Sequence, residues 1–260
     1  MTHYSTITVE YTDEVAWVTL NRPQVYNAFN DIQVGELTAC FSHLSSESGI
    51  SAIVLTGKGR HFCAGADLNW MKQVASYTKE ENRADSHLLG EMYRTIAMSP
   101  KPVVGCINGS AFGGGVGLVA ACDIAVCSDE AQFAFSEVKL GIVPAVISTY
   151  VLPKIGLSHA RHLFITGERF PAQKALEIGL IHSLSPPAQL SKRTAEYLSL
   201  LKSSGPHAIA AVKELLEQWS TMEKEAFSTY TEELIANLRA SEGGTEGIRA
   251  FLEKRKPVWR

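Results

Sequence analysis

The sequence predicts an α/β fold followed by a helical C-terminal region, and three observations support this prediction. Short apolar runs closed by glycine or turn residues recur through the first half of the chain, as expected of buried strands. These runs span residues 15–20, 53–56, 103–107, 124–127 and 132–135. After residue 187, apolar residues recur at helical spacing instead. The chain has 260 residues, 45% hydrophobic and 20% charged, which is enough for one large core.

The N-terminal elements follow in a regular order. Strand-like alternation begins at residues 7–11, and a strand over residues 15–20 is stopped by Arg22-Pro23. A helix is expected over residues 31–46, because apolar residues recur at helical spacing after the cap candidate Asn30. The first quarter of the chain therefore predicts two strands and one helix.

Helices dominate the rest of the chain. A polar helical insertion is expected between residues 70 and 98, and the last strand pattern covers residues 180–184. Further helices are predicted over residues 187–204, 207–219, 222–240 and 244–255. The breaker Ser203-Ser204-Gly205-Pro206 supports a division into a core over residues 1–200 and a C-terminal region over residues 201–260.

Composition and charge disfavour several kinds of partner. The formal net charge is -3 and the longest basic cluster is Lys254-Arg255-Lys256, so nucleic acid is not expected to bind. The sequence has no run of 18 apolar residues and no signal-peptide pattern, so no membrane association is expected. The five cysteines lie in apolar runs without a C-x-x-C pair, which indicates reduced thiols and a cytoplasmic location.

Two glycine-containing loops carry the clearest chemical signal. Gly113-Gly114-Gly115 lies between an apolar strand and a short apolar helix, so that bare N–H groups face outward at the positive end of the helix. A second small-residue segment, residues 61–68, follows the apolar run 53–56. Two such loops can supply converging N–H donors that stabilise an oxyanion. The alternative is that the glycines only allow close packing of helix on strand.

Glu137 is the candidate acid–base residue. It stands at the end of an apolar strand and precedes Val138 and Leu140, so we expect it to be shielded from water. Shielding raises the pKa of a carboxyl group toward the range useful for proton transfer. The alternative is a solvated carboxylate at a strand end.

Five motifs occur in register along the chain. They are Leu20-Asn21-Arg22-Pro23 with Asn27-Ala28-Phe29, Phe62 to Leu68, Asn108-Gly109 through Gly115, Cys122-Asp123-Ile124-Ala125, and Phe135-Ser136-Glu137 with Gly141-Ile142-Val143-Pro144. With these motifs the chain resembles the crotonase superfamily, in particular the enoyl-CoA hydratases and isomerases. The resemblance extends to residues 251–257. It implies a ββα spiral core, a C-terminal helical trimerisation region, and a homotrimer or a dimer of trimers.

The resemblance also implies roles for individual residues. The N–H groups of Ala66 and Gly114 would form the oxyanion hole for an acyl-thioester carbonyl, and Glu137 would move the proton. Residues implied to contact the acyl-CoA substrate are Ala64, Ala66, Asp67, Leu68, Gly114, Ala145, Phe251 and Lys254, the last two from a neighbouring subunit. Neither a metal nor a separate cofactor is implied, because coenzyme A is part of the substrate.

Two positions depart from the family pattern. Two-glutamate hydratases carry their second carboxylate three residues after the middle glycine of the triplet, and here that position is Gly117. The segment Pro144-Ala145-Val146-Ile147-Ser148 stands where most relatives are rich in glycine. Both departures resemble the bacterial subgroup that hydrates branched glutaconyl-CoA esters. We expect the space at Gly117 to admit the branch or distal carboxylate of such a substrate, and the Ala145 N–H to remain available at a helix N-terminus.

The resulting prediction is an acyl-CoA hydro-lyase acting on a 3-methylglutaconyl-CoA-like substrate. A Δ3,Δ2-enoyl-CoA isomerase that uses Glu137 alone is the near alternative. An NAD-dependent oxidoreductase is a third possibility, because residues 115–120 match G-x-G-x-x-A, although the helix is short for a dinucleotide-binding crossover. A non-catalytic acyl-CoA-binding or RNA-binding module is the rival outside catalysis.

Overall fold

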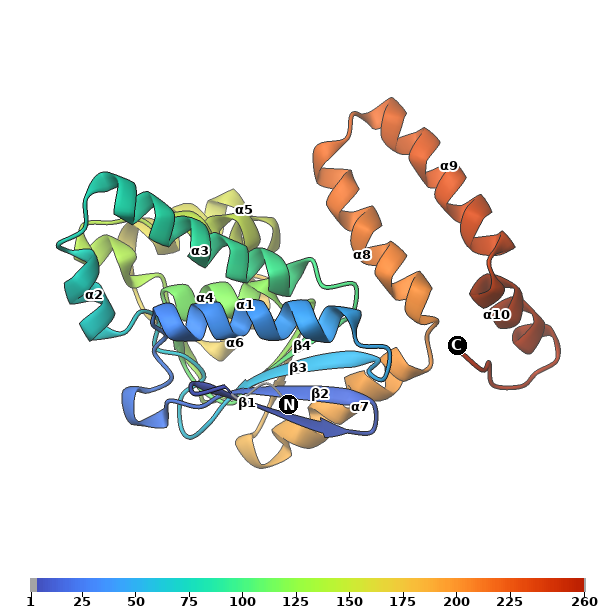
Figure 1. Ribbon diagram of the computed structural model, residues 1–260, viewed down its shortest axis with the longest axis horizontal. Helices are drawn as coiled ribbons and strands as arrows, with labels where there is room; N and C mark the ends of the chain where they lie inside the picture. The colour runs from blue at the N-terminus through green and yellow to red at the C-terminus, as the bar shows by residue number, and fades with distance from the viewer. Residues whose placement is uncertain (1–3, 260) are drawn as a thin grey trace.

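The computed structural model describes residues 4–259 and contains one large sheet with helices on both faces (Figure 1). Its strands are β1 (Ile7–Thr12), β2 (Val15–Leu20), β3 (Ala52–Gly57), β4 (Val103–Ile107), β6 (Ile124–Ser128) and β9 (Ser183–Ser185). They lie in the order β1-β2-β3-β4-β6-β9. Only the β1–β2 hairpin is antiparallel, whereas all later neighbours are parallel. The predicted α/β class is confirmed.

Alternate residues of the strands enter two different hydrophobic clusters, because successive side chains point to opposite faces of a sheet. Ile53 and Leu55 belong to the main core beneath α1 (Asp31–Ser46), while Val54 packs toward α7 (Leu190–Lys202) on the other face. Figure 1 shows these two helices on opposite sides of the sheet. A continuous apolar strand sequence is therefore what burial on both faces requires.

A second, smaller sheet positions the segments that form the candidate site. It consists of β5 (Ala111–Phe112), β7 (Gln132–Ala134) and β8 (Phe170–Pro171). The short helix α4 (Gly114–Ala121) follows β5 directly, and the 3-10 helix η2 (Ser136–Leu140) follows β7. Since β5 pairs with β7 in parallel, the segments that follow the two strands leave the same edge of the sheet.

The polar insertion forms two helices rather than one, α2 (Leu68–Val74) and α3 (Lys79–Ala97). A capping box at Thr78 and Glu81 begins α3: Thr78 Oγ1 accepts from the Glu81 amide, and the Glu81 carboxylate accepts from the Thr78 amide. Helix α1 begins, as predicted, with the Asn30 side chain accepting from the amide of Gln33. Local capping signals thus give both helix starts.

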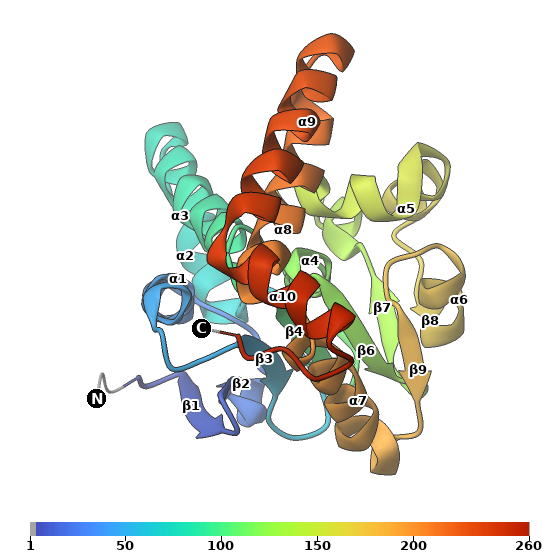
Figure 2. The ribbon, with the colours of Figure 1, turned by 90° about the vertical axis from the view of Figure 1, so that its right-hand side faces the viewer.

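The C-terminal helices α8 (Pro206–Thr221), α9 (Lys224–Ala240) and α10 (Glu242–Leu252) extend away from the sheet (Figures 1 and 2). No residue of α8 or α9 is fully buried within the described chain. One ion pair, between Lys213 Nζ and Asp123 Oδ2 at 2.6 Å, joins α8 to the core. The predicted boundary at residue 200 falls within the last turn of α7, just before this unit begins.

The remaining helices complete the chain and correct two expectations. They are η1 (Pro23–Val25), α5 (Ala145–Thr166), α6 (Ala172–Glu177) and η3 (Pro187–Gln189). The strand expected over residues 180–184 begins only at Ser183, because Leu180 and Ile181 are buried in the turn after α6 without joining the sheet. Glu137 lies in η2 and not on a strand end, since β7 stops at Ala134.

Two further properties follow from the described residues 4–259. All five cysteines in this range are buried free thiols, as predicted. No helix in the same range is long and apolar enough to cross a lipid bilayer.

Candidate active site

Residues of two separate loops come together beside α4. Cys63 forms a bridge with Ala111 of β5, and its carbonyl accepts a hydrogen bond of 3.0 Å from the amide of Phe112. A Cβ placed on Gly65 would lie 3.6 Å from the amide nitrogen of Gly114. The sequence predicted each loop, and the structure shows that they meet.

The two amides expected to form the oxyanion hole donate to no acceptor within the described chain. The neighbours of Ala66 are engaged: the Gly65 carbonyl accepts from Phe29, and the Asp67 amide donates to the Phe29 carbonyl. Gly114 is the first residue of α4, where an amide has no partner inside the helix. Backbone donors of this kind, fixed on two rigid segments, can stabilise developing negative charge on an oxygen.

Glycine is required at Gly113, which precedes α4, and at Gly114, the first residue of the helix. Gly113 has a φ of 49° and a ψ of −124°, and its amide donates to the carbonyl of Ala134. A Cβ on Gly114 would come within 2.5 Å of Cζ of Phe29 and 2.9 Å of the hydroxyl of Tyr93. The glycines therefore do more than ease packing, because a side chain would displace the donor peptide.

Glu137 lies against this turn. A Cβ on Gly113 would lie 3.3 Å from Oε1 of Glu137, so the carboxylate faces the backbone that leads into the donor amide. Its Oε2 is buried without a hydrogen-bond partner in the described residues. Burial raises the pKa of the Glu137 carboxyl above its ordinary value. A shielded carboxyl group with a raised pKa is suited to accept and return a proton.

The space at Gly117 is filled, contrary to expectation. A Cβ on Gly117 would lie 2.3 Å from Cγ2 of Ile147 and 2.9 Å from the ring of Tyr93. Helices α3 and α5 close over α4 here, so no room is left for a substrate branch or a distal carboxylate. The expectation that the missing glutamate leaves a void is therefore wrong.

The amide of Ala145 is also unavailable as a donor. It donates to the carbonyl of Val143 at 2.7 Å, across Pro144 with φ of −73° and ψ of 56°. This is an inverse γ-turn, which pairs the amide within the loop itself. The predicted role of the Ala145 N–H is thus contradicted.

The segment implied to lie along coenzyme A is held by an ion pair. Asp67 Oδ2 accepts from Nη2 of Arg22 at 2.7 Å, and Oδ1 caps α2 by accepting from the amide of Asn69. Asp67 is 5% exposed, whereas the next residue, Leu68, is 74% exposed. Asp67 therefore positions the loop of Ala64 and Ala66, and Leu68 offers apolar surface beside it.

Phe251 and Lys254 do not join the site within one chain. Phe251 is 82% exposed and lies in the last turn of α10, which packs on α9 and α8. Figure 1 shows α10 at the opposite end of the molecule from α2. Any contact of these two residues with the substrate must come from another subunit.

Other candidates from the sequence lack the required surroundings. Burial raises the pKa of the Cys63 thiol to about 12, which disfavours a reactive thiolate. Gly115 and Gly117 lie inside α4 and are closed off by Cys63 and Ile147, so the G-x-G-x-x-A match forms no phosphate-binding turn. Among the described residues, no group of three His, Cys, Asp or Glu side chains is placed to hold a metal ion.

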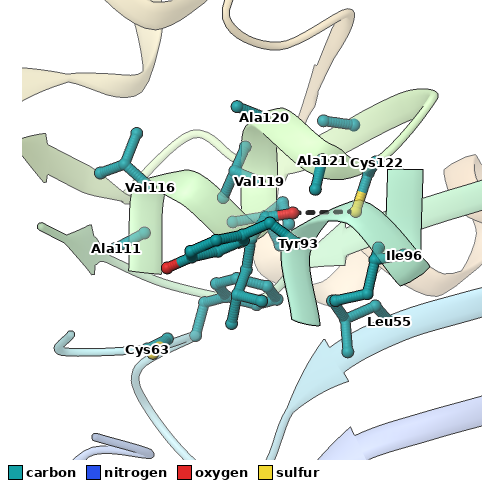
Figure 3. Packing of buried hydrophobic residues seen from close by; sticks show 14 of the residues in the cluster. Leu55, Cys63, Tyr93, Ile96, Ala111, Val116, Val119, Ala120, Ala121 and Cys122 are labelled. Carbon is teal, nitrogen blue, oxygen red and sulfur yellow. Dashed lines mark hydrogen bonds between the residues drawn. The ribbon is translucent and has the colours of Figure 1, made fainter. Parts of the chain in front are cut away.

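Tyr93 belongs to the site but has no local sequence signal. It is fully buried in α3, and its hydroxyl donates to the carbonyl of Gly114 at 2.7 Å. In the sequence it is one more apolar-face residue of an amphipathic helix, so periodicity cannot separate it from ordinary core. Figure 3 shows its ring against α4, with the hydroxyl directed toward the end of the helix that carries Val116.

The chain is similar in sequence to known proteins over nearly its whole length. A sequence model described as "Enoyl-CoA hydratase/isomerase" matches residues 10–260. The short-chain-enoyl-CoA hydratase of Clostridium acetobutylicum is 31% identical, covering 96% of this chain and 95% of the relative. The 2,3-dehydroadipyl-CoA hydratase of Escherichia coli is 32% identical over 98% of this chain and 99% of the relative.

Solved structures extend the likeness to the fold. The crystal structure of an enoyl-CoA hydratase from Shewanella pealeana superposes with a TM-score of 0.94 at 37% identity, covering 98% of this chain and 96% of that one. Sequence and structure both match over nearly the whole length, including the C-terminal helices. The chain is an enzyme and belongs to the enoyl-CoA hydratase/isomerase family of the crotonase superfamily.

Proposed function

We propose that the enzyme adds water across the double bond of an α,β-unsaturated acyl-CoA thioester with Glu137 as its only acid–base residue. The observation that carries this proposal is the juxtaposition of two backbone amides, at Ala66 and Gly114, with a buried carboxylate that faces Gly113; within residues 4–259 these amides have no acceptor. The amides would bind the thioester oxygen and draw electron density from C3.

The proposed reaction has two proton movements. Glu137 takes a proton from water while the water oxygen bonds to C3, and the resulting enolate oxygen is held by Ala66 and Gly114. The protonated Glu137 then delivers its proton to C2, which restores the carbonyl. No metal or separate cofactor takes part in these steps.

A single carboxylate also fits a Δ3,Δ2-enoyl-CoA isomerase. In that reaction Glu137 would take a proton from C2 and return it to C4, and no water would add. Glycine at position 117, with its space filled by Ile147 and Tyr93, favours any mechanism with only one carboxylate. The two activities share the same oxyanion hole and differ in the bond made at C3.

For the acyl group we propose a 3-methylglutaconyl-CoA-like substrate, as in leucine breakdown. Support comes from the resemblance at Gly117 and at residues 144–148 to hydratases of such esters. The name of the Escherichia coli relative, 2,3-dehydroadipyl-CoA hydratase, also describes an acyl group with a distal carboxylate. The substrate branch does not lie at Gly117, because that space is closed.

The deciding experiment compares three substrates on the purified enzyme. We expect water addition to 3-methylglutaconyl-CoA to be faster than to crotonyl-CoA and faster than conversion of a 3-enoyl-CoA to its 2-enoyl isomer. Loss of the enoyl-thioester absorbance reports hydration, and chromatography of the products identifies the isomer. Ready isomerisation without water addition to either ester would replace the hydratase proposal by the isomerase.

We also propose a homotrimer or a dimer of trimers in the cytoplasm. Exposed apolar side chains are concentrated on the C-terminal helices, which bury little within one chain. They include Val212, Leu216, Trp219, Ile235, Ile248 and Phe251. The five free thiols support a reducing compartment, and the net charge of -3 gives no attraction for nucleic acid. Light scattering after size-exclusion chromatography would test the assembly, and a monomer at micromolar concentration would overturn it.

A further inference from the structure

Tyr93 connects the helical insertion to the residue that carries an oxyanion donor. Its hydroxyl donates 2.7 Å to the carbonyl oxygen of Gly114, and no other side chain of the described residues hydrogen-bonds to Gly114. Its ring lies beside Gly117, one turn further along α4. The buried Tyr93 side chain therefore contacts α4 at both Gly114 and Gly117.

The Tyr93 hydroxyl is fixed in a single environment. The residue is fully buried, and its ring lies 5.9 Å from that of Tyr150 on α5. Burial, followed by the nearby Cys63 thiol and Glu137 carboxyl, raises the pKa of Tyr93 well above its ordinary value. The phenol therefore stays neutral and keeps the proton that it donates to Gly114.

Two hydrogen bonds hold the peptides on either side of Gly114. The Gly113 carbonyl, in the peptide that carries the Gly114 amide, accepts from the amide of Val116 at 2.8 Å, and the Tyr93 hydroxyl holds the Gly114 carbonyl of the next peptide. Gly113 has the positive φ that only glycine adopts readily, and Gly114 has no side chain to restrain it. A hydrogen bond weakens steeply when its angle departs from linear, so a small rotation of Gly114 would misdirect its amide. The Tyr93 hydrogen bond opposes that rotation by holding the other polar group of the same residue.

We propose that Tyr93 is a positioning residue of the oxyanion hole, holding Gly114 so that its amide points at the thioester oxygen. Tyr93 does not touch the substrate and transfers no proton. This inference rests on the proposed function, because it assumes that Ala66 and Gly114 bind a thioester carbonyl.

The test uses Tyr93→Phe, which keeps the ring that fills the space at Gly117 and removes only the hydroxyl. We expect kcat to fall about tenfold, a fraction of the 10²–10³-fold effect of losing a whole oxyanion donor. KM should stay within about twofold of the wild-type value, since the donor matters most in the transition state. Tyr150→Phe is the matched control: it removes a hydroxyl from the neighbouring ring, and it should behave as wild type.

A spectroscopic readout separates positioning from a merely structural role. Cinnamoyl-CoA is an α,β-unsaturated thioester whose absorption moves to longer wavelength when its carbonyl is polarised. We expect a smaller shift for the probe bound to Tyr93→Phe than for the probe bound to wild type or Tyr150→Phe. An unchanged shift in Tyr93→Phe, with or without a loss of kcat, would overturn the proposal.

If Tyr93→Phe does not fold, 3-fluorotyrosine placed at position 93 retains the ring and makes the hydroxyl a stronger donor, so the shift should equal or exceed that of wild type; a smaller shift would refute the role. If saturating cinnamoyl-CoA shows no shift with the wild-type enzyme, the oxyanion hole itself is misassigned. The proposed function and the role of Tyr93 thus fail in distinguishable ways.

Discussion

The carboxylate of Glu137 lies over the backbone of Gly113, with Oε1 3.3 Å from where a Cβ on that glycine would stand. The peptide that joins Gly113 to Gly114 carries one of the two candidate oxyanion donors. The base and the donor are therefore held by one turn, between the small sheet and α4. This arrangement requires glycine at position 113 for two reasons, a φ of 49° and the approach of the carboxylate.

The first prediction concerns the chemistry of Glu137. Glu137→Gln keeps the shape of the side chain but cannot take a proton from water, so kcat should fall about 10²-fold or more. Binding of a saturated acyl-CoA, measured by calorimetry, should change little, because the oxyanion donors remain. Near-wild-type turnover would remove Glu137 from the mechanism.

The same substitution should raise stability at neutral pH. The pKa of Glu137 is raised in the folded state by burial, so the folded protein holds this proton more tightly than the unfolded chain does. The free energy of unfolding then falls as the pH rises from the unfolded pKa through the folded pKa. Above both values the cost of burying the charged carboxylate is at its maximum. Glu137→Gln carries no such penalty and should unfold at a higher temperature than wild type at pH 7. An unfolding temperature of Glu137→Gln that does not exceed that of wild type at pH 7 would contradict this. So would a difference between the two unfolding temperatures that does not shrink near pH 4.

Gly114 provides the second test of the oxyanion hole. Gly114→Ala places a methyl group 2.5 Å from Phe29 and 2.9 Å from the Tyr93 hydroxyl, so the donor peptide must shift. We expect kcat to fall about 10²-fold or more. Gly35→Ala in α1 is the control, because nothing lies within 4 Å of a Cβ there. The control should retain activity, and its free energy of unfolding should rise by about 0.5–1 kcal/mol because alanine has a higher helix propensity than glycine. An active Gly114→Ala enzyme would refute the assignment.

Much of the fold can be predicted from the sequence because the patterns that mark its helices and strands are local. The cap at Asn30, the apolar runs of the strands and the breaker at residues 203–206 each act within a few residues. The burial of Leu180 and Ile181 shows the limit: an apolar run predicts burial, but pairing in a sheet depends on strands elsewhere in the chain. The strand therefore begins later than predicted.

The candidate site was predictable from the sequence only where a local pattern marks its residues. Glycine at positions 113 and 114 signals a bare loop, and Glu137 after a strand signals a shielded carboxylate. Tyr93 and Ile147 could not be assigned, because their importance comes from contacts made across separate helices. The same contacts explain why a missing side chain at Gly117 leaves no void.

Asp67 gives a prediction about pH and stability. Burial alone would raise its pKa, but hydrogen bonds from the Asn69 amide and from Arg22 outweigh burial and lower it. Stability from the charged form is therefore present above the unfolded pKa, about 4, and is lost as the pH falls through the lower folded pKa. Asp67→Asn should lower the free energy of unfolding by about 1–3 kcal/mol at pH 7. Denaturant titrations at several pH values should show the gap closing below pH 4; a pH-independent gap would argue against the ion pair as its cause.

The last prediction concerns the packing at Gly117. Gly117→Ala puts a methyl group 2.3 Å from Cγ2 of Ile147, so overpacking should cost about 1–3 kcal/mol despite the better helix propensity of alanine. Ile147→Ala alone should cost about 2–5 kcal/mol through the cavity that it opens. In the double variant the new methyl group occupies part of that cavity. The double variant should therefore lose less free energy of unfolding than the sum of the two single variants' losses, by about 0.5–3 kcal/mol. Urea titrations of the four proteins give this coupling energy, and additive losses would mean that the two residues do not touch.

Gly117→Glu should be at least as destabilised as Gly117→Ala and should not hydrate crotonyl-CoA faster than wild type. A stable Gly117→Glu enzyme with faster crotonyl-CoA hydration would show that a second carboxylate can be restored, and that α3 and α5 yield space at this position.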